Sequence, residues 1–208
     1  MFSLRRVLVT SAMALASPVL IAADLVSPVP HILTVIDRIV ADVAEQRDQL
    51  EQDETKCSAF ALVDRHLRPE FNLHLAARYM LLQHWPSAAS AQDRFVNAFY
   101  GSVVATFGDL IRHFDANTLR MAPADDLPDG ERLKIDGEMT FTDETTVDLS
   151  FRVRLIDDLW QIFDVQAGSM SYVEAYRDEY LYDIAEIGLD GLIERLEKEA
   201  ADYRACGQ

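Results

Sequence analysis

The chain has 208 residues, half of them apolar and 26% charged, which is typical of one globular domain and excludes a disordered, collagen-like or disulfide-dense chain. Its 35 acidic residues against 19 Lys and Arg residues set a formal charge of −16. Such a surface repels nucleic acids and anionic membrane faces, so we expect no nucleic-acid ligand and protein partners that present basic patches.

Residues 1–23 are predicted to be a secretory signal peptide. Arg5 and Arg6 precede an apolar run, and small residues stand at Ala22 and Ala23, as at a signal-peptide cleavage site. The run contains hydroxyl residues and a proline and falls short of the roughly 20 apolar residues of a spanning helix. A retained membrane anchor is therefore the weaker interpretation, and we expect a soluble, exported protein.

The first half of the mature chain is predicted to be helical. Four segments repeat apolar residues at intervals of three and four, the spacing of a buried helix face. They cover residues 31–50, 58–67, 69–85 and 90–114. Pro69 occupies the first turn of the third helix, where its missing N–H costs little. The fourth is expected to be the longest helix and to lie across a sheet.

The second half predicts that sheet and two closing helices. Apolar and polar residues alternate as in antiparallel strands with one apolar face. Strands are expected at 118–122, 133–141, 147–155 and 159–165, and helices at 173–187 and 189–203. Gly188 separates these helices as a C-terminal cap.

This order of elements predicts the fold class α+β. We expect a four-stranded curved antiparallel sheet wrapped by helices, an NTF2-like cone with extra helices. Residues 24–208 are expected to form a single domain, because nothing in the composition requires a second one.

The chain contains two cysteines, Cys57 and Cys206. In an oxidising compartment an even pair is more often bridged than free, so a disulfide between them is the favoured interpretation. The alternative is that Cys206, two residues from the end, stays unpaired.

Catalytic and metal-binding patterns are absent from the sequence. No G-x-S-x-G elbow and no Gly-rich phosphate loop occur, so we expect neither a hydrolase nor a nucleotide cofactor. The five histidines form no H-x-H or H-x-x-x-H pair, so no metal site is predicted. Asp164 is the one acid inside an apolar strand; a capping role is favoured for it, and a general base is the alternative.

Arg152 and Arg154 alternate with the apolar residues of their predicted strand, and Arg177 lies on the polar side of the following helix. We interpret all three as solvated surface, with contact to a partner as the alternative.

Four segments in order resemble the toluene-tolerance or MlaC family, the periplasmic phospholipid carriers of Gram-negative bacteria. They are LRPEFNLHLAARYMLLQHW, SAQDRFVNAFYGSVVATF, LWQIFDVQAGSMSYVEAYRDEY and GLDGLIERL. The resemblance covers residues 58–196. Family positions are matched by Phe71, Trp85, Gln92, Phe95, Trp160, Phe163, Asp164, Ser171, Tyr176 and Arg177. The sequence differs from the family pattern at three places. Asn72 stands where the family usually has an acid, Leu82 stands where it commonly has glycine, and GSMS replaces its EGVS.

The resemblance implies a deep apolar cavity that holds the acyl chains of a phospholipid cargo, with no cofactor and no enzymatic activity. The large side chains of the long helix, the sheet and the following helix are the candidates for its lining. We expect it to be lined by Tyr100, Val103, Val104, Phe107, Ile111, Phe151, Val153, Phe163, Val165, Met170, Tyr172 and Tyr180.

The resemblance also implies protein partners for a monomeric periplasmic shuttle. These are an inner-membrane ABC transporter with a ring of substrate-binding domains and an outer-membrane lipoprotein–porin complex. Together with them the protein would maintain the lipid asymmetry of the outer membrane. The alternatives are a non-enzymatic periplasmic adaptor with a solid core and an NTF2-like enzyme that uses Asp164.

Overall fold

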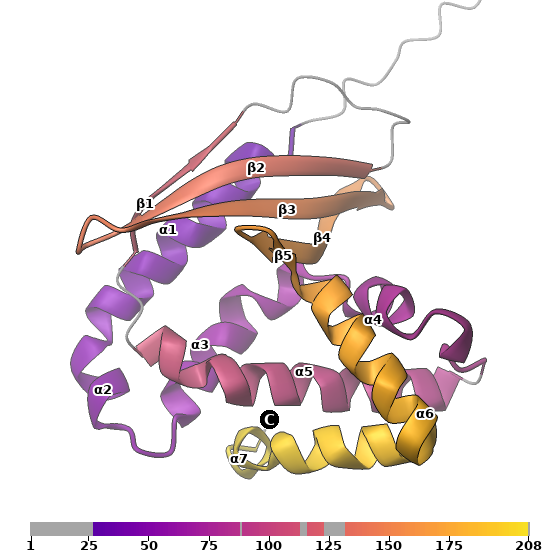
Figure 1. Ribbon diagram of the computed structural model, residues 1–208. Coiled ribbons are helices and arrows are strands. Elements are labelled where there is room, and N and C mark those ends of the chain that lie inside the picture. Colours follow the sequence, from indigo (N-terminus) through magenta and orange to yellow (C-terminus); the bar gives the residue numbers. More distant parts are fainter. Residues whose placement is uncertain (1–26, 88, 113–115, 123–131, 208) are drawn as a thin grey trace, which may run out of the picture.

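The computed structural model describes residues 27–87, 89–112, 116–122 and 132–207. An antiparallel sheet forms one layer, and most of the helices lie on one side of it (Figure 1). The predicted signal peptide, residues 1–23, lies outside the described residues.

Seven α-helices are described. They are α1 Val29–Glu45, α2 Arg47–Gln52, α3 Cys57–His66, α4 Leu73–Leu81, α5 Ala89–Arg112, α6 Tyr172–Glu199 and α7 Ala201–Ala205, with short 3-10 turns at Arg68–Glu70 and Leu82–His84. The segment predicted as one helix over 31–50 is therefore two, because the chain leaves helical geometry at Gln46 (φ −99°, ψ 12°).

The predicted helix over 69–85 is wrong at both ends. The chain is extended at Phe71, which forms an isolated parallel bridge with Ile162, and the N–H of Asn72 donates to the Ile162 carbonyl at 2.7 Å. Helix α4 therefore starts at Leu73, where the Asn72 side chain caps it by accepting from the N–H of Leu75 at 2.7 Å.

The sheet contains the four predicted strands and a fifth. Its strands are β1 Ala116–Met121, β2 Arg132–Phe141, β3 Thr146–Ile156, β4 Leu159–Ala167 and β5 Met170–Ser171, in that spatial order. The added strand β5 has two residues and pairs with the end of β4. It leads directly into α6, whose first turn is capped by Ser171 accepting from the N–H of Glu174.

A β-bulge interrupts the alternation of β4. Arg152 of β3 is paired with Asp164, but the next residue, Val153, is paired with Ile162. Phe163 therefore has no partner across the ladder, which is the arrangement of a bulge. As a result Ile162, Phe163 and Asp164 are all buried. In a regular strand, neighbouring side chains point to opposite faces, so either Phe163 or its two neighbours would point away from the core.

Helix α5 is the longest unbroken helix among the described residues, as expected, because the longer span of α6 is two helices joined at a kink. Gly188 breaks the geometry of α6, with φ 75° and ψ 170°, so the predicted interruption falls where it was expected. After this kink the second half of α6 runs beside α5 (Figure 1).

Three clusters of buried side chains hold the layers together. One joins α4, α5 and α6, and a second joins α1, α2, α3, α5 and α7. The third lies between α1 and the inner face of the sheet, where Ile32 belongs to one cluster with Leu133, Ile135, Phe151 and Val153. Helix α1 thus closes one part of the sheet and leaves the β4 end to α4, α5 and α6.

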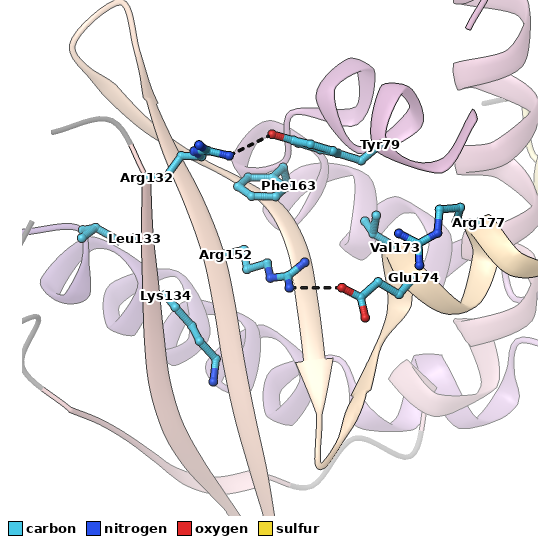
Figure 2. Close-up of a pocket in the computed structure, with 9 residues that line it drawn as sticks. All are labelled: Tyr79, Arg132, Leu133, Lys134, Arg152, Phe163, Val173, Glu174 and Arg177. Carbon is cyan, nitrogen blue, oxygen red and sulfur yellow. Dashed lines mark hydrogen bonds and ion pairs between the residues drawn. The ribbon is translucent and has the colours of Figure 1, made fainter. Parts of the chain in front are cut away.

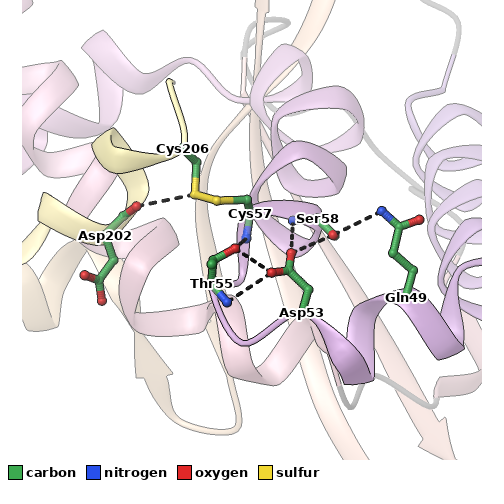
Figure 3. The surroundings of a disulfide bond; sticks show 7 residues. All are labelled: Gln49, Asp53, Thr55, Cys57, Ser58, Asp202 and Cys206. Atoms are coloured by element: carbon green, nitrogen blue, oxygen red, sulfur yellow. Dashed lines mark hydrogen bonds between the residues drawn. A yellow bond between two sulfur atoms is a disulfide. The ribbon is translucent and has the colours of Figure 1, made fainter.

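A disulfide ties the C-terminal segment to α3. Cys57 and Cys206 are bonded, with their Cα atoms 5.4 Å apart (Figure 3). Beside the bridge, the Asp53 carboxylate accepts from the N–H and hydroxyl of Ser58 at 2.8 and 2.6 Å and from Thr55. These bonds hold the pKa of Asp53 well below its usual range, the Ser58 hydroxyl being the main cause.

Candidate functional site

An apolar cavity of about 340 Å³ lies between β4, α3, α4, α5 and the start of α6. Its walls are almost entirely hydrocarbon and aromatic side chains. The lining residues are Val63, Leu67, Phe71, Leu73, Ala76, Met80, Phe99, Tyr100, Val103, Val104, Phe107, Ile111, Phe163, Asp164, Val165, Tyr172, Val173 and Tyr176. The volume is in the range of small-molecule pockets, about 300–1,000 Å³, and near its lower end.

Eight of the twelve residues expected to line a pocket lie on this cavity. They are Tyr100, Val103, Val104, Phe107, Ile111, Phe163, Val165 and Tyr172. The five from α5 follow its three- and four-residue spacing, so one stripe of that helix forms a wall of the cavity. The Phe163 bulge and Val165 bring β4 to the opposite side.

The other four expected residues lie elsewhere. Phe151 and Val153 are buried in the sheet core under α1, because their strand pairs with the α1-covered part of β2. Tyr180 is 1% exposed and packs among α4 and α5, while Met170 of β5 is 48% exposed.

Helices α3 and α4 form a wall that the sequence reasoning did not assign to the cavity. Val63 and Leu67 stand four residues apart, and Leu73, Ala76 and Met80 follow at intervals of three and four. Both stripes are visible in the sequence. What the sequence lacks is any sign that they face β4 and α5 across a space instead of packing solidly.

Aromatic rings pack edge to face around the cavity. Phe107 and Tyr172 have ring centroids 5.7 Å apart, and Phe99 and Tyr176 5.6 Å apart. Burial raises the pKa of Tyr176 to about 12, so its hydroxyl stays neutral even at alkaline pH. Tyr100 turns its hydroxyl away to donate to Asp64 at 2.5 Å, and burial, the larger cause, together with this bond raises its pKa.

Asp164 is the one charged residue among the described lining residues, and both oxygens of its carboxylate accept hydrogen bonds. Oδ1 accepts from the N–H of Val173 at 3.0 Å, and Oδ2 accepts from the Ser171 hydroxyl at 2.7 Å. Oδ2 also accepts from Arg152 Nη1 at 3.3 Å. The side chain therefore anchors the start of α6 to β4, which is the capping role expected for it.

The sequence model of the MlaC protein family matches residues 33–198. The chain belongs to the MlaC family. A search of curated proteins found no match.

A solved structure shares the MlaC-family fold seen in this chain. It is a phospholipid-binding protein from Ralstonia solanacearum, determined in complex with a phospholipid at 1.53 Å resolution. The match has a TM-score of 0.74 and 17% identity, and it covers 86% of this chain and 98% of that one. The α+β fold of helices on an antiparallel sheet is thereby confirmed.

Within the residues that the structure describes, no group of three or more His, Cys, Asp or Glu side chains is arranged to hold a metal ion. Nor does any described helix combine the length and apolarity needed to cross a membrane.

Proposed function

We propose that this protein is a periplasmic phospholipid carrier that holds acyl chains in the apolar cavity. The observation that carries the proposal is the cavity itself, whose described lining residues include a single charged side chain, already paired with Arg152. Membership of the MlaC family supports it, as does the phospholipid bound to the Ralstonia protein of the same fold.

The hydration of acyl chains explains why a carrier needs such a cavity. Two chains of about 16 carbons, at about 0.8 kcal/mol per CH₂, carry some 25 kcal/mol of unfavourable hydration. A phospholipid therefore does not cross an aqueous compartment unaided. Because the cavity volume is near the lower end for ligand pockets, the aromatic side chains at its walls are proposed to rearrange as the chains enter.

Direction of transfer is proposed to come from protein partners. A bilayer shelters acyl chains as well as the cavity does, so the net free energy of transfer between them is small. The family resemblance implies an inner-membrane ABC transporter with a substrate-binding-domain ring and an outer-membrane lipoprotein–porin complex. A monomer that shuttles between the two would support outer-membrane lipid asymmetry.

The two alternatives fit the site less well. An enzyme with Asp164 as general base needs a carboxylate oxygen free to take a proton, and both oxygens of Asp164 accept hydrogen bonds from the protein. A solid-core adaptor has no use for an apolar cavity of about 340 Å³.

The test is to purify the protein from a periplasm and record native mass spectra before and after organic extraction. A carrier should show a mass increment of one phospholipid that extraction removes, with the lipid recovered in the organic phase. A clean apo mass, with no lipid in the extract, would exclude the carrier.

A further inference from the structure

A second hollow, of about 410 Å³, lies beside the apolar cavity and has the opposite character. Figure 2 shows the charged side chains that line it, which come from β2, β3 and α6. It is lined by Tyr79, Arg132, Leu133, Lys134, Arg152, Phe163, Val173, Glu174 and Arg177. Four of these residues are cationic and one is acidic, in a chain whose formal charge is −16.

The sheet register brings like charges together at this place. Lys134 is directly opposite Arg152, and Arg132 is directly opposite Arg154. Cross-strand pairs of like charge destabilise a sheet. The basic residues gather at the end of β2 and β3 nearest to α6, and an anion bound among them would offset their repulsion.

The existing partners of these cations are weak enough to admit an anion. Lys134 pairs with Asp136 at 3.0 Å and Arg177 with Asp178 at 3.3 Å, and both carboxylates are mostly exposed, at 64% and 76%. Exposed ion pairs contribute little, about 0–1 kcal/mol. Arg132 donates to a neutral group, the Tyr79 hydroxyl, at 3.4 Å.

Arg152 is the cation that is held in place. It pairs with the buried Asp164 at 3.3 Å and with Glu174 at 3.2 Å, so the one acidic side chain of the pocket is already engaged (Figure 2). The positive end of α6, which begins at Tyr172, adds to the potential at this side of the pocket.

The pocket and the apolar cavity are adjacent, because Phe163 and Val173 line both. The Arg152–Asp164 pair also connects them, with the arginine on the pocket and the carboxylate on the cavity. A molecule with apolar chains in one space and an anionic group in the other could therefore occupy both.

We propose that the basic pocket binds a phosphate group, with Arg132 and Arg177 as its mobile ligands. Guanidinium groups match phosphate oxygens with paired, charge-assisted hydrogen bonds. The phosphate belongs to the head group of a lipid whose chains lie in the cavity, which rests on the proposed carrier function, or to free phosphate. The binding site for the cargo would then include a polar subsite in addition to the cavity.

The experiment compares the wild type with a double variant, Arg132→Gln with Arg177→Gln. Arg152 is left unchanged because its loss would leave Asp164 buried without its cation. Arg38→Gln with Lys198→Gln is the matched control, since it removes the same charge from exposed positions that line neither space. Equal thermal unfolding of the three proteins shows that the fold is intact.

Delipidated protein is incubated with vesicles that contain equal amounts of dioleoylphosphatidylglycerol and dioleoylglycerol, and the bound lipid is counted by native mass spectrometry. The two lipids have the same acyl chains and differ in the phosphate head group. The wild type and the control should prefer the phosphate-bearing lipid by about tenfold, as expected for one or two charge-assisted hydrogen bonds. The pocket variant should lose that preference while still taking up dioleoylglycerol.

Titration with inorganic phosphate, followed by calorimetry, identifies the source of the anion. Phosphate binding that the pocket variant loses, with an unchanged lipid preference, assigns the site to free phosphate and refutes the head-group assignment. Unchanged lipid preference and unchanged phosphate binding in the pocket variant overturn the proposal. If the wild type takes up neither lipid, the carrier function fails, and the phosphate titration still decides whether the pocket is an anion site.

Discussion

Removal of the disulfide between Cys57 and Cys206 should lower the stability of the protein without dismantling its fold. The bridge spans 149 residues of sequence, so it restricts most of the unfolded chain. In the folded state α7 keeps other contacts, because Tyr203 is 4% exposed and donates to Asp64 at 3.0 Å. The double substitution of both cysteines by serine therefore acts mainly on the unfolded state.

The loop length sets the magnitude. A loop of about 150 residues loses roughly 17 cal/mol/K of closure entropy, or about 5 kcal/mol at 25 °C. For a domain of this size that corresponds to a fall in Tm of about 10–20 °C. The assay is urea unfolding of the oxidised wild type, the reduced wild type and the serine variant.

The reduced wild type and the serine variant should lose stability equally, and reductant should not affect the variant. A loss below about 1 kcal/mol, or a further loss on adding reductant to the variant, would refute the reasoning from loop closure.

Four further substitutions probe the cavity, the sheet core, the anchor of α6 and the loop before α3. Phe107→Glu, at a half-buried position on the cavity, should reduce lipid loading at least tenfold in native mass spectra, with a loss of unfolding free energy below about 2 kcal/mol. Phe151→Glu, in the sheet core, should instead prevent folding, because it buries a charge without a partner; equal effects of the two would make Phe107 ordinary core. Asp164→Ala should cost about 1–3 kcal/mol in urea unfolding, since it leaves the buried Ser171 hydroxyl and an α6 N–H without their acceptor, and no measurable loss would contradict the anchoring role. Asp53→Asn should make the free energy of unfolding less sensitive to acid. The lowered pKa of Asp53, due first to Ser58, stabilises the folded protein above about pH 4, and this stabilisation is lost as the pH falls towards the lowered value. Chemical unfolding at several pH values should therefore show the wild type and this variant converging in acid, and parallel curves would contradict the assignment.

The local pattern of the sequence was sufficient for most elements of the fold. The stripe of α5 and the alternation of β2 and β3 arise from side chains within one element, so periodicity finds them. Gly188 was likewise identified as a break, since positive φ at a glycine is a local property. The segment around Phe71 was not, because its extended conformation depends on pairing with Ile162, which is distant in sequence.

The cavity shows the same division residue by residue. Phe107 and Ile111 were assigned to the lining from the face of one helix, and they lie on it. Phe151 and Tyr180 also stand on the apolar stripes of their elements but lie in solid core. Apolar periodicity predicts that a side chain is buried, and it does not distinguish a wall of a cavity from a packed interior.

The sequence alone was enough to predict the α+β class and its helical and extended segments. It also favoured the pairing of the two cysteines and showed the resemblance to a phospholipid-carrier family. Only the tertiary structure decided that Phe163 forms a bulge, that α3 and α4 face β4 across a space, and that Lys134 and Arg152 stand side by side on the sheet. The physical reason is that periodicity and composition are properties of neighbours along the chain. Strand register, empty volume and charge clustering depend on contacts between residues far apart in sequence.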